Sequence, residues 1–525
     1  MVGGCGMNQR VTARIIGGKK LSTAEYKEYL NTARSLSDGA RKLGVSQKEF
    51  VAMGMELKAH PYIAPFLETL YGGGMLCMAS DHVNLPYRHL LERCEDHAKA
   101  LQTMASQLAE LSETIIRAQS LYEHAEEASR RVMNNMLRSL FISTPQAAYI
   151  ALGVSALNGV GTSFAKEGKL NWSYLVESTA WMQEPFVSAI GFHASKLDIP
   201  EQPKDFKSTL ELITSRMFPL IGIGSLTQNN HSGKSVNLGL EKINRLLIPH
   251  CDATHGDNLT VTRVYPNTEV VRGGTSMQDA IADQRRLSEG PLNGDLESGL
   301  EYGTIAVCKY LKANGTYAWR ITIPGTDGNH DSPMDWYTNF ELMSADEQQR
   351  ASAESLRFLR EVMRQTGIQP DEPVELVGHS QGGIIAAAAA ADMQDEYDIR
   401  HIATFGSPIA KFDIPEKTMV TAIEMDNEGI AALDGAANPD TENWLTIRGS
   451  VREDDGTPQG VLSGAEVEDS SGERKSTHYL KNHEAGYRYA YDTGNKAVLE
   501  HARDFQDVVD GELQETQYYQ GRIGK

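Results

Sequence analysis

Residues 374–391 read VELVGHSQGGIIAAAAAA, and Ser380 lies between the apolar run that opens this stretch and the alanine-rich run that closes it. The first run is typical of a short buried strand and the second of a helix. Gly378 and Gly382 suit a tight turn, because a side chain at either position would collide with the neighbouring strand or helix. The pattern predicts a nucleophile elbow, which lifts a serine hydroxyl to where a histidine and two backbone donors can reach it. A glycine-rich turn that merely starts a helix is the alternative.

Length and composition bound the class of protein. The chain has 525 residues, more than one hydrophobic core usually supports, so we expect at least two domains. Lys and Arg total 50 against 70 Asp and Glu, and the net charge of -20 argues against nucleic acid as a partner. The five cysteines are odd in number and widely scattered, so neither a disulfide framework nor a zinc site is expected. We expect no metal and no organic cofactor.

Residues 1–257 are predicted to form an all-α helical domain. Helix formers dominate from 23 to about 135, which predicts a long helical hairpin, and mostly helical segments follow to about 257. Two heptad series predict one narrow apolar seam that packs within the chain. The first series is Leu101, Leu108, Ile115 and Tyr122, and the second is Leu111, Ala118, Ala125 and Val132. The apolar stretches 147–165 and 186–192 are expected to form buried or self-associating helices, because polar residues interrupt the first and neither is long enough to span a bilayer. Membrane insertion is the alternative, since closely spaced Gly and Ala also let helices approach one another in lipid.

Residues 258–525 are predicted to form an α/β domain. A strand pattern begins at Asn258, a hairpin is expected around 313–315, and strands then alternate with helices. Such alternation implies a mainly parallel sheet flanked by helices, which is the layout of the α/β hydrolases. In this layout the catalytic acid and then the histidine follow the serine along the chain.

The candidates for the acid and the base therefore lie after Ser380. Asp426, Glu428 and the more distant Asp434 follow a predicted strand at 420–425. The histidines are His478, His483 and His501. His501 is spaced among charged residues and is expected at the surface. We favour His483 over His478 as the base, because it lies where a loop enters a helix.

A serine hydrolase also needs backbone donors for the oxyanion of its tetrahedral intermediate. One is the amide of Gln381, directly after the nucleophile. The second is expected from the loop that ends the apolar strand ITIPG, where Thr326 or Asp327 can turn an amide toward the serine. This loop precedes the elbow along the chain, as the fold requires.

These motifs resemble bacterial α/β hydrolases related to the class 3 lipases, in which a Pro-Gly-Thr strand end, a GHSxGG elbow and a TFGSP strand follow one another. The matching segments are 324–326, 378–383 and 404–408. The resemblance implies that the acid lies in the turn 427–431, which makes Glu428 the acid, although the family has aspartate there and a proline at the position of Ala431. It also implies that a histidine with a tyrosine four residues later is the base, which fits His483 and Tyr487.

The first half resembles, more weakly, the helical-hairpin modules of type VII secretion substrates (the WXG/LXG-like type). Tyr122 and Glu126 form their Tyr-x-x-x-Asp/Glu pattern, and Gly72–Gly74 stands where such modules carry a Trp-x-Gly turn. The resemblance implies a bacterial protein exported by a type VII-like route, with secretion machinery or a helical protein as a partner of this half. The N-terminus lacks the apolar stretch of a general secretory signal peptide, so without that route we expect a cytoplasmic protein.

The motifs together predict a serine esterase or lipase that acts on acyl-ester or lipid substrates through an acyl-enzyme. Ser380 is the expected nucleophile, His483 the base and Glu428 the acid. The alternative is an exported interaction or toxin-like effector whose helical half binds a partner or a membrane, with a secondary or degenerate hydrolase half. The first hypothesis expects a fragment beginning at Asn258 to hydrolyse esters by itself.

Overall fold

The computed structural model describes residues 9–18, 23–59, 87–118, 121–196, 208, 235–292, 297–453, 464–467 and 477–525. The chain forms two compact units, one of residues 1–20 and 122–525 and the other of residues 21–121. The boundary between units therefore does not coincide with the one expected at 257/258. Most of the expected helical domain belongs to the same unit as the sheet.

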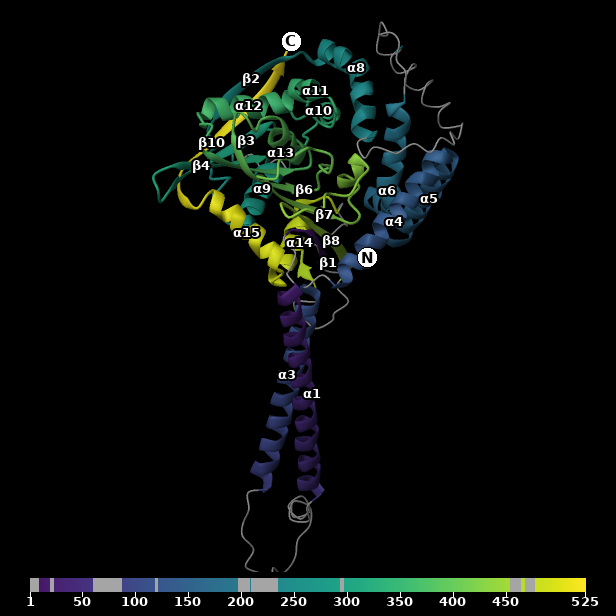
Figure 1. The fold of residues 1–525 in the computed structure, drawn as a ribbon, viewed down its shortest axis with the longest axis vertical. Helices are drawn as coiled ribbons and strands as arrows, with labels where there is room; N and C mark the ends of the chain where they lie inside the picture. The colour runs from purple at the N-terminus through teal and green to yellow at the C-terminus, as the bar shows by residue number, and fades with distance from the viewer. Residues whose placement is uncertain are drawn as a thin grey trace, which may run out of the picture. The chain divides into compact units, whose positions relative to one another are not determined.

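The larger unit is built on a ten-stranded sheet with the strand order β2-β10-β3-β4-β5-β6-β7-β8-β1-β9 (Figure 1). Its strands are β1 (Gln9–Gly17), β2 (Asn258–Val264), β3 (Thr304–Lys312), β4 (Tyr317–Ile323), β5 (Pro373–His379), β6 (Asp398–Phe405), β7 (Met419–Met425), β8 (Trp444–Glu453), β9 (Ala465–Glu466) and β10 (Gly511–Gly524). Strands β4 to β8 are parallel, and antiparallel pairs extend the sheet on both sides. This confirms the predicted α/β fold, including the β3–β4 hairpin, in which Gly315 has the positive φ of 82° that a tight turn requires.

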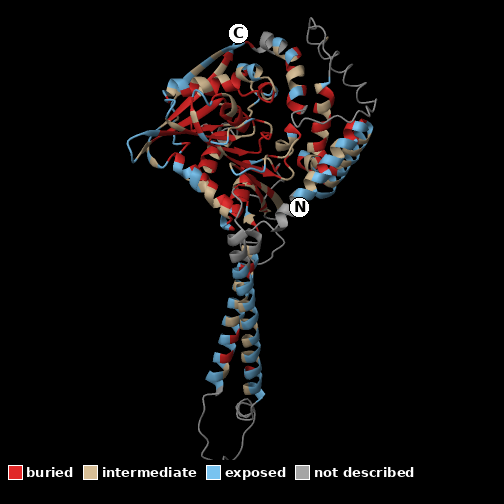
Figure 2. Ribbon diagram, viewed as in Figure 1, coloured by how far each residue is buried: buried red, intermediate tan, exposed pale blue. Residues whose placement is uncertain are grey.

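Helices cover both faces of the sheet. They are α9 (Met277–Leu292), α10 (Thr338–Leu342), α11 (Glu347–Ser352), α12 (Glu354–Thr366), α13 (Gln381–Asp392), α14 (Leu480–Asp492) and α15 (Lys496–Val508), with a 3-10 turn η1 at Ala431–Asp434. Alternation along β5 divides the core, because Val374 and Leu376 pack with α12 and α13, whereas Val377 packs with α9, α14 and α15. Figure 2 shows the resulting buried interior on both sides of the strands.

Four further helices belong to the larger unit: α4 (Leu121–Ser143), α5 (Pro145–Glu167), α6 (Trp172–Ser195) and α8 (Ser235–His255). Helix α6 contacts α5, α8 and η1. The stretch 186–192 within α6 is partly buried, as expected. The stretch 147–165 is not, because only 17% of the most apolar part of α5 is buried. By length and composition alone, α5 could cross a membrane.

The smaller unit contains a hairpin of α1 (Thr23–Ala59) and α3 (Tyr87–Ala118). Leu101 and Leu108 are partly buried in the seam, as predicted. Leu111 and Val132 are exposed, so the predicted companion series is wrong at these two positions, and the side chains of Ala118, Tyr122 and Ala125 lie outside the described residues. The true companions are the small residues Cys94, Ala98 and Ser112, which are buried and leave room for the two helices to approach closely. Ser112 donates to the carbonyl of Ala33 over 2.8 Å. The expected turn at Gly72–Gly74 lies outside the described residues.

Three strands, β1, β9 and β10, were not predicted. Strand β1 pairs antiparallel with β8 along its whole length, from Gln9 to Gly17. Val11 and Ile15 point into the hydrophobic core. The alternation in QRVTARIIG is the signal that could have revealed β1, and it places the N-terminal segment in the sheet that carries the candidate site.

Replacing Ile15 with alanine is expected to lower the free energy of unfolding by about 2–4 kcal/mol, because it leaves a cavity between β1 and the core. Urea denaturation measures the change. The matched control is Thr12→Ala on the same strand, where the side chain is only partly buried, and it should cost less than about 1 kcal/mol. Equal, small effects of both variants would contradict the placement of β1 in the sheet.

Candidate active site

Ser380 occupies a strained turn between β5 and α13. Its φ of 54° makes it the only non-glycine residue with a positive φ in the part of the chain that the structure describes. Its amide donates to the carbonyl of Phe405 on β6 over 2.9 Å. Such a conformation costs about 1–3 kcal/mol and persists only where the surroundings impose it. Ser380 therefore lies in a strained strand-to-helix turn, which is the backbone setting that the sequence predicts for it.

Close backbone approach explains the two glycines that flank the serine. A Cβ on Gly378 would lie 2.2 Å from the carbonyl carbon of Gly382, and one on Gly382 would lie 2.2 Å from the carbonyl oxygen of Ile323. Neither separation is compatible with a side chain. The glycines thus allow β4, β5 and α13 to converge beneath Ser380.

Glu428 lies between two histidines. Its Oε2 atom is 3.0 Å from Nδ1 of His478 and 3.0 Å from Nε2 of His483. Its Oε1 atom accepts a hydrogen bond from the amide of Met425 over 3.1 Å. The structure therefore brings together the predicted acid and both of the histidines considered from the sequence.

The two histidines differ in their access to Ser380. His478 lines the same cavity as Ser380, and its ring stacks on His379 with 4.6 Å between centroids. His483 is fully buried, and its Nδ1 atom faces the carbonyl of Tyr479 over 3.2 Å, so both of its ring nitrogens are already engaged. The sequence favoured His483 as the base, but the geometry favours His478. The helix α14 begins at Leu480, which turns His483 into the core and leaves His478 in the preceding loop.

The electrostatics of the cluster favour an ionised acid. Burial disfavours the charged form of Glu428, but attraction to His483 and hydrogen bonds from both imidazoles outweigh it and hold the pKa well below its usual range. Burial, followed by repulsion from His478 and His483, keeps the pKa of His379 well below its ordinary value. Glu428 is thus a carboxylate beside a neutral His379.

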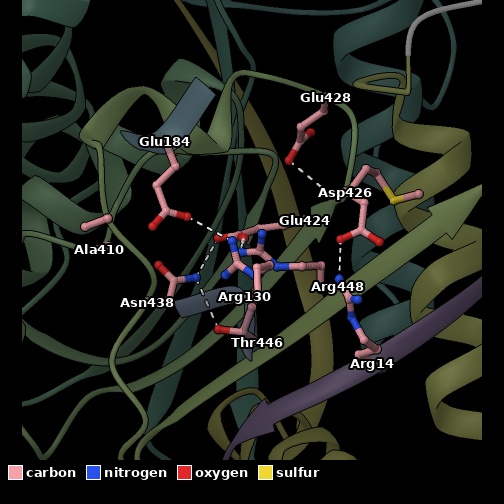
Figure 3. A network of polar contacts seen from close by, with 12 residues as sticks. Arg14, Arg130, Glu184, Ala410, Glu424, Asp426, Glu428, Asn438, Thr446 and Arg448 are labelled. Atoms are coloured by element: carbon pink, nitrogen blue, oxygen red, sulfur yellow. Dashed lines mark hydrogen bonds and ion pairs between the residues drawn. The ribbon is translucent and has the colours of Figure 1, made fainter. Parts of the chain in front are cut away.

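The remaining acid candidates point elsewhere. Asp426 pairs with Arg14 on β1 (Figure 3). It also accepts a hydrogen bond from the hydroxyl of Ser450. Asp434 accepts hydrogen bonds from the amides of Ala410, over 2.7 Å, and Ala436, over 3.1 Å. Both carboxylates therefore hold the surrounding loops and sheet together.

The expectation that His501 lies at the surface is wrong. It is buried, its Nδ1 atom lies 3.2 Å from the hydroxyl of Thr421, and burial lowers its pKa to about 4. The charged residues around it occupy the other faces of α15, which packs on the sheet.

The loop after β4 lies against the serine. A Cβ on Gly325 would be 3.2 Å from the Cβ of Ser380, and Thr326 lines the cavity. The amide of Asp327 donates to the carbonyl of Met334 over 3.1 Å, which leaves Thr326 as the better donor of the two residues considered.

One short segment holds the side chains of both oxyanion candidates. The Gln381 side chain donates to the carbonyl of Asp335 over 2.8 Å and to the hydroxyl of Thr338 over 2.6 Å. Asn339 donates to the hydroxyl of Thr326 over 3.1 Å. Residues 335–339 thereby orient the two backbones whose amides are the candidate donors.

Glu428, His478 and His483 also meet the distance requirement for a metal site. Their donor atoms lie within 4.8 Å of one another. The Oε2 atom of Glu428 is 3.0 Å from a ring nitrogen of each histidine, which is a hydrogen-bond distance. Hydrogen bonding therefore explains why the three groups lie so close together.

Two residues of the site were missed in the sequence. His379 stacks on His478 and lies 3.1 Å, through Nε2, from its carbonyl oxygen. Gly406 has a φ of 59°, and a Cβ there would lie 2.5 Å from Oε2 of Glu428 and 2.6 Å from Nδ1 of His478. The GHS and TFGSP motifs contain both residues, but only the tertiary contacts show what they touch.

Comparison with known proteins indicates the class of protein to which the domain belongs. Residues 328–423 match a family model described as alpha/beta hydrolase. The matched segment includes Ser380 and the strand β6 but ends before Glu428 and both histidines. No curated protein and no solved structure matches the chain. The match and the observed sheet together define an α/β-hydrolase domain, which indicates hydrolase activity.

Gly406→Ala is expected to destabilise the protein by about 2–4 kcal/mol, because it combines backbone strain with a clash against the Glu428–His478 pair. The matched control is Gly494→Ala, where φ is 70° and nothing lies within 4 Å of the added carbon. It should cost only the strain, about 1–2 kcal/mol. Thermal and urea unfolding measure the difference, and equal costs would contradict the close packing of the pair on Gly406.

Proposed function

We propose that the protein is a serine hydrolase that cleaves acyl esters, with Ser380 as nucleophile, His478 as base and Glu428 as acid. The observation that carries the proposal is that the elbow serine and a carboxylate-bonded imidazole line one cavity. His483 is assigned a positioning role, because it holds the same carboxylate oxygen from inside the core. This assignment revises the preference from the sequence.

The mechanism follows from these positions. The nitrogen of His478 opposite its Glu428 contact takes the proton of Ser380 as Oγ attacks the ester carbonyl. The amides of Gln381 and Thr326 stabilise the oxyanion, and the imidazolium returns the proton to the leaving alcohol. Water activated by His478 then attacks the acyl-enzyme carbonyl and releases the acid. Ionised Glu428 stabilises the imidazolium in both steps.

The preference for esters rests on the resemblance to the class 3 lipases and on the apolar cavity beside Ser380. The triad chemistry serves both ester and amide bonds. The family has aspartate where this chain has Glu428, but the glutamate makes the contact to an imidazole that an aspartate would make. The departure from the family pattern is therefore compatible with activity.

A fluorophosphonate probe should label Ser380, because labelling requires an activated serine. Ser380→Ala should abolish labelling and lower ester hydrolysis by about 10⁴-fold or more. His478→Ala should cost about as much. His483→Gln, which keeps a donor toward Glu428, should cost much less and serves as the matched comparison.

Each outcome bears on a different part of the proposal. Unchanged hydrolysis by Ser380→Ala would exclude the mechanism. A larger loss of hydrolysis in His483→Gln than in His478→Ala, with both variants shown to be folded by circular dichroism, would indicate that His483 is the base.

A second candidate function is that of an exported effector that binds membranes. It is favoured by the exposed apolar face of α5, where Ile150, Val154 and Leu157 are each more than 60% exposed. Export by a type VII-like route through Tyr122 and Glu126 belongs to the same proposal, and the side chains of these two residues lie outside the described ones.

Sedimentation with phosphatidylcholine vesicles tests this second function in the Ser380→Ala background. Vesicle binding that is lost in Val154→Asp and retained in Lys166→Asp, near the end of the same helix, would support it. No binding by the parent protein would contradict it.

A further inference from the structure

The cavity beside Ser380 is large for the site of a small acyl group. Its volume is about 560 Å³, within the range of about 300–1,000 Å³ that is typical of pockets for drug-sized ligands. His379, Ser380 and His478 form one part of its wall. An acetyl group attached to Ser380 would leave most of this space unfilled.

The lining of the cavity is mainly apolar. Its apolar side chains come from several elements of the larger unit and include Val187, Ile190, Val236, Leu240, Ile243, Leu287, Met343 and Ile384. The lining holds three carboxylates, those of Glu289, Glu301 and Asp327. Two of them are bonded within the protein, since Asp327 accepts from Ser332 over 2.6 Å and Glu301 pairs with Arg522 over 2.7 Å. The cavity therefore offers a ligand mostly hydrocarbon contact.

Helices α6 and α8, which precede the α/β part of the chain, supply one wall. They cross at two glycines: a Cβ on Gly191 would lie 2.5 Å from the Cα of Val236, and one on Gly239 would lie 2.8 Å from the Cβ of Ala194. The close crossing places Ile190 of α6 and Leu240 of α8 on the same cavity.

Two asparagines attach α8 to the α/β part. Asn237 donates to the carbonyl of Met343 over 2.8 Å, and Asn244 donates to that of Phe340 over 2.7 Å. Both asparagines are buried. The two hydrogen bonds thus fix α8 to Phe340 and Met343, which themselves line the cavity.

Exposed apolar side chains continue from the cavity to the surface. Trp336, Phe340, Leu433 and Tyr479 belong to the lining and are each more than a third exposed. An apolar chain can therefore remain in contact with apolar groups from the protein surface to the serine.

We infer that this cavity binds the acyl chain of long-chain esters, and that Ile190, Leu240 and Ile243 of α6 and α8 determine the preferred chain length. The inference rests on the proposed serine hydrolase function and adds its substrate class. A fragment beginning at Asn258 lacks this wall and strand β1, so it is not expected to reproduce the activity of the full chain.

The first test is a series of p-nitrophenyl esters from acetate to palmitate, hydrolysed by the full-length protein. Each added methylene that enters the cavity should raise kcat/KM by about four-fold until the cavity is filled. Leu240→Trp and the milder Ile243→Phe should lower the laurate-to-acetate ratio of kcat/KM by about ten-fold or more. Leu238→Trp is the matched control, because Leu238 lies on α8 but outside the cavity wall and is exposed.

A binding measurement separates this inference from the proposed function. Ser380→Ala should bind a fluorescent long-chain fatty acid, and the added Leu240→Trp change should weaken binding by about ten-fold, whereas Leu238→Trp should not. Fatty-acid binding without any ester hydrolysis or Ser380 labelling would support the acyl cavity and overturn the proposed function. Hydrolysis that is fastest with acetate, or fatty-acid binding that is equal in Leu240→Trp and its control, would overturn the acyl cavity alone.

Discussion

The close approach of backbones at the nucleophile turn is the constraint on which the rest of the site depends. Ser380 has a conformation that costs about 1–3 kcal/mol, and it is maintained because β4, β5 and α13 meet beneath it with glycine at positions 378 and 382. The same convergence brings the loop after β4 against the serine, so Gly325 and Thr326 lie at the cavity. One steric condition thus positions the nucleophile and one candidate for oxyanion stabilisation.

A second condition is the charge balance around Glu428. A buried carboxylate is costly unless hydrogen bonds and opposite charge compensate for desolvation, and here two imidazoles and the amide of Met425 do so. Because His483 holds the carboxylate from the core, His478 can face the cavity without being the only partner of the acid. The absence of a side chain at Gly406 leaves room for this pair.

The α/β part does not form the larger unit by itself. Strand β1, near the start of the chain, extends the sheet by pairing with β8. Helices α6 and α8, which precede β2 in the sequence, line the cavity. Helix α6 also packs on the loop of the acid, since a Cβ on Gly429 would lie 3.1 Å from Oε1 of Gln183. The helices that the sequence assigns to a separate domain therefore contribute to the cavity and support the loop that carries Glu428.

Local patterns in the sequence predicted the turn at Ser380 and the alternation of strands and helices, because each depends on residues near one another in the chain. They did not reveal β1 and β10, whose pairing partners lie far away in the sequence, or the burial of His501. Which of His478 and His483 lies at the cavity of Ser380 is visible only in the tertiary structure. Both histidines lie near the start of α14 and are only five residues apart in the chain. The imidazole that shares a cavity with Ser380 is set by the residue at which α14 begins and by how α14 packs, and the spacing of the two histidines specifies neither.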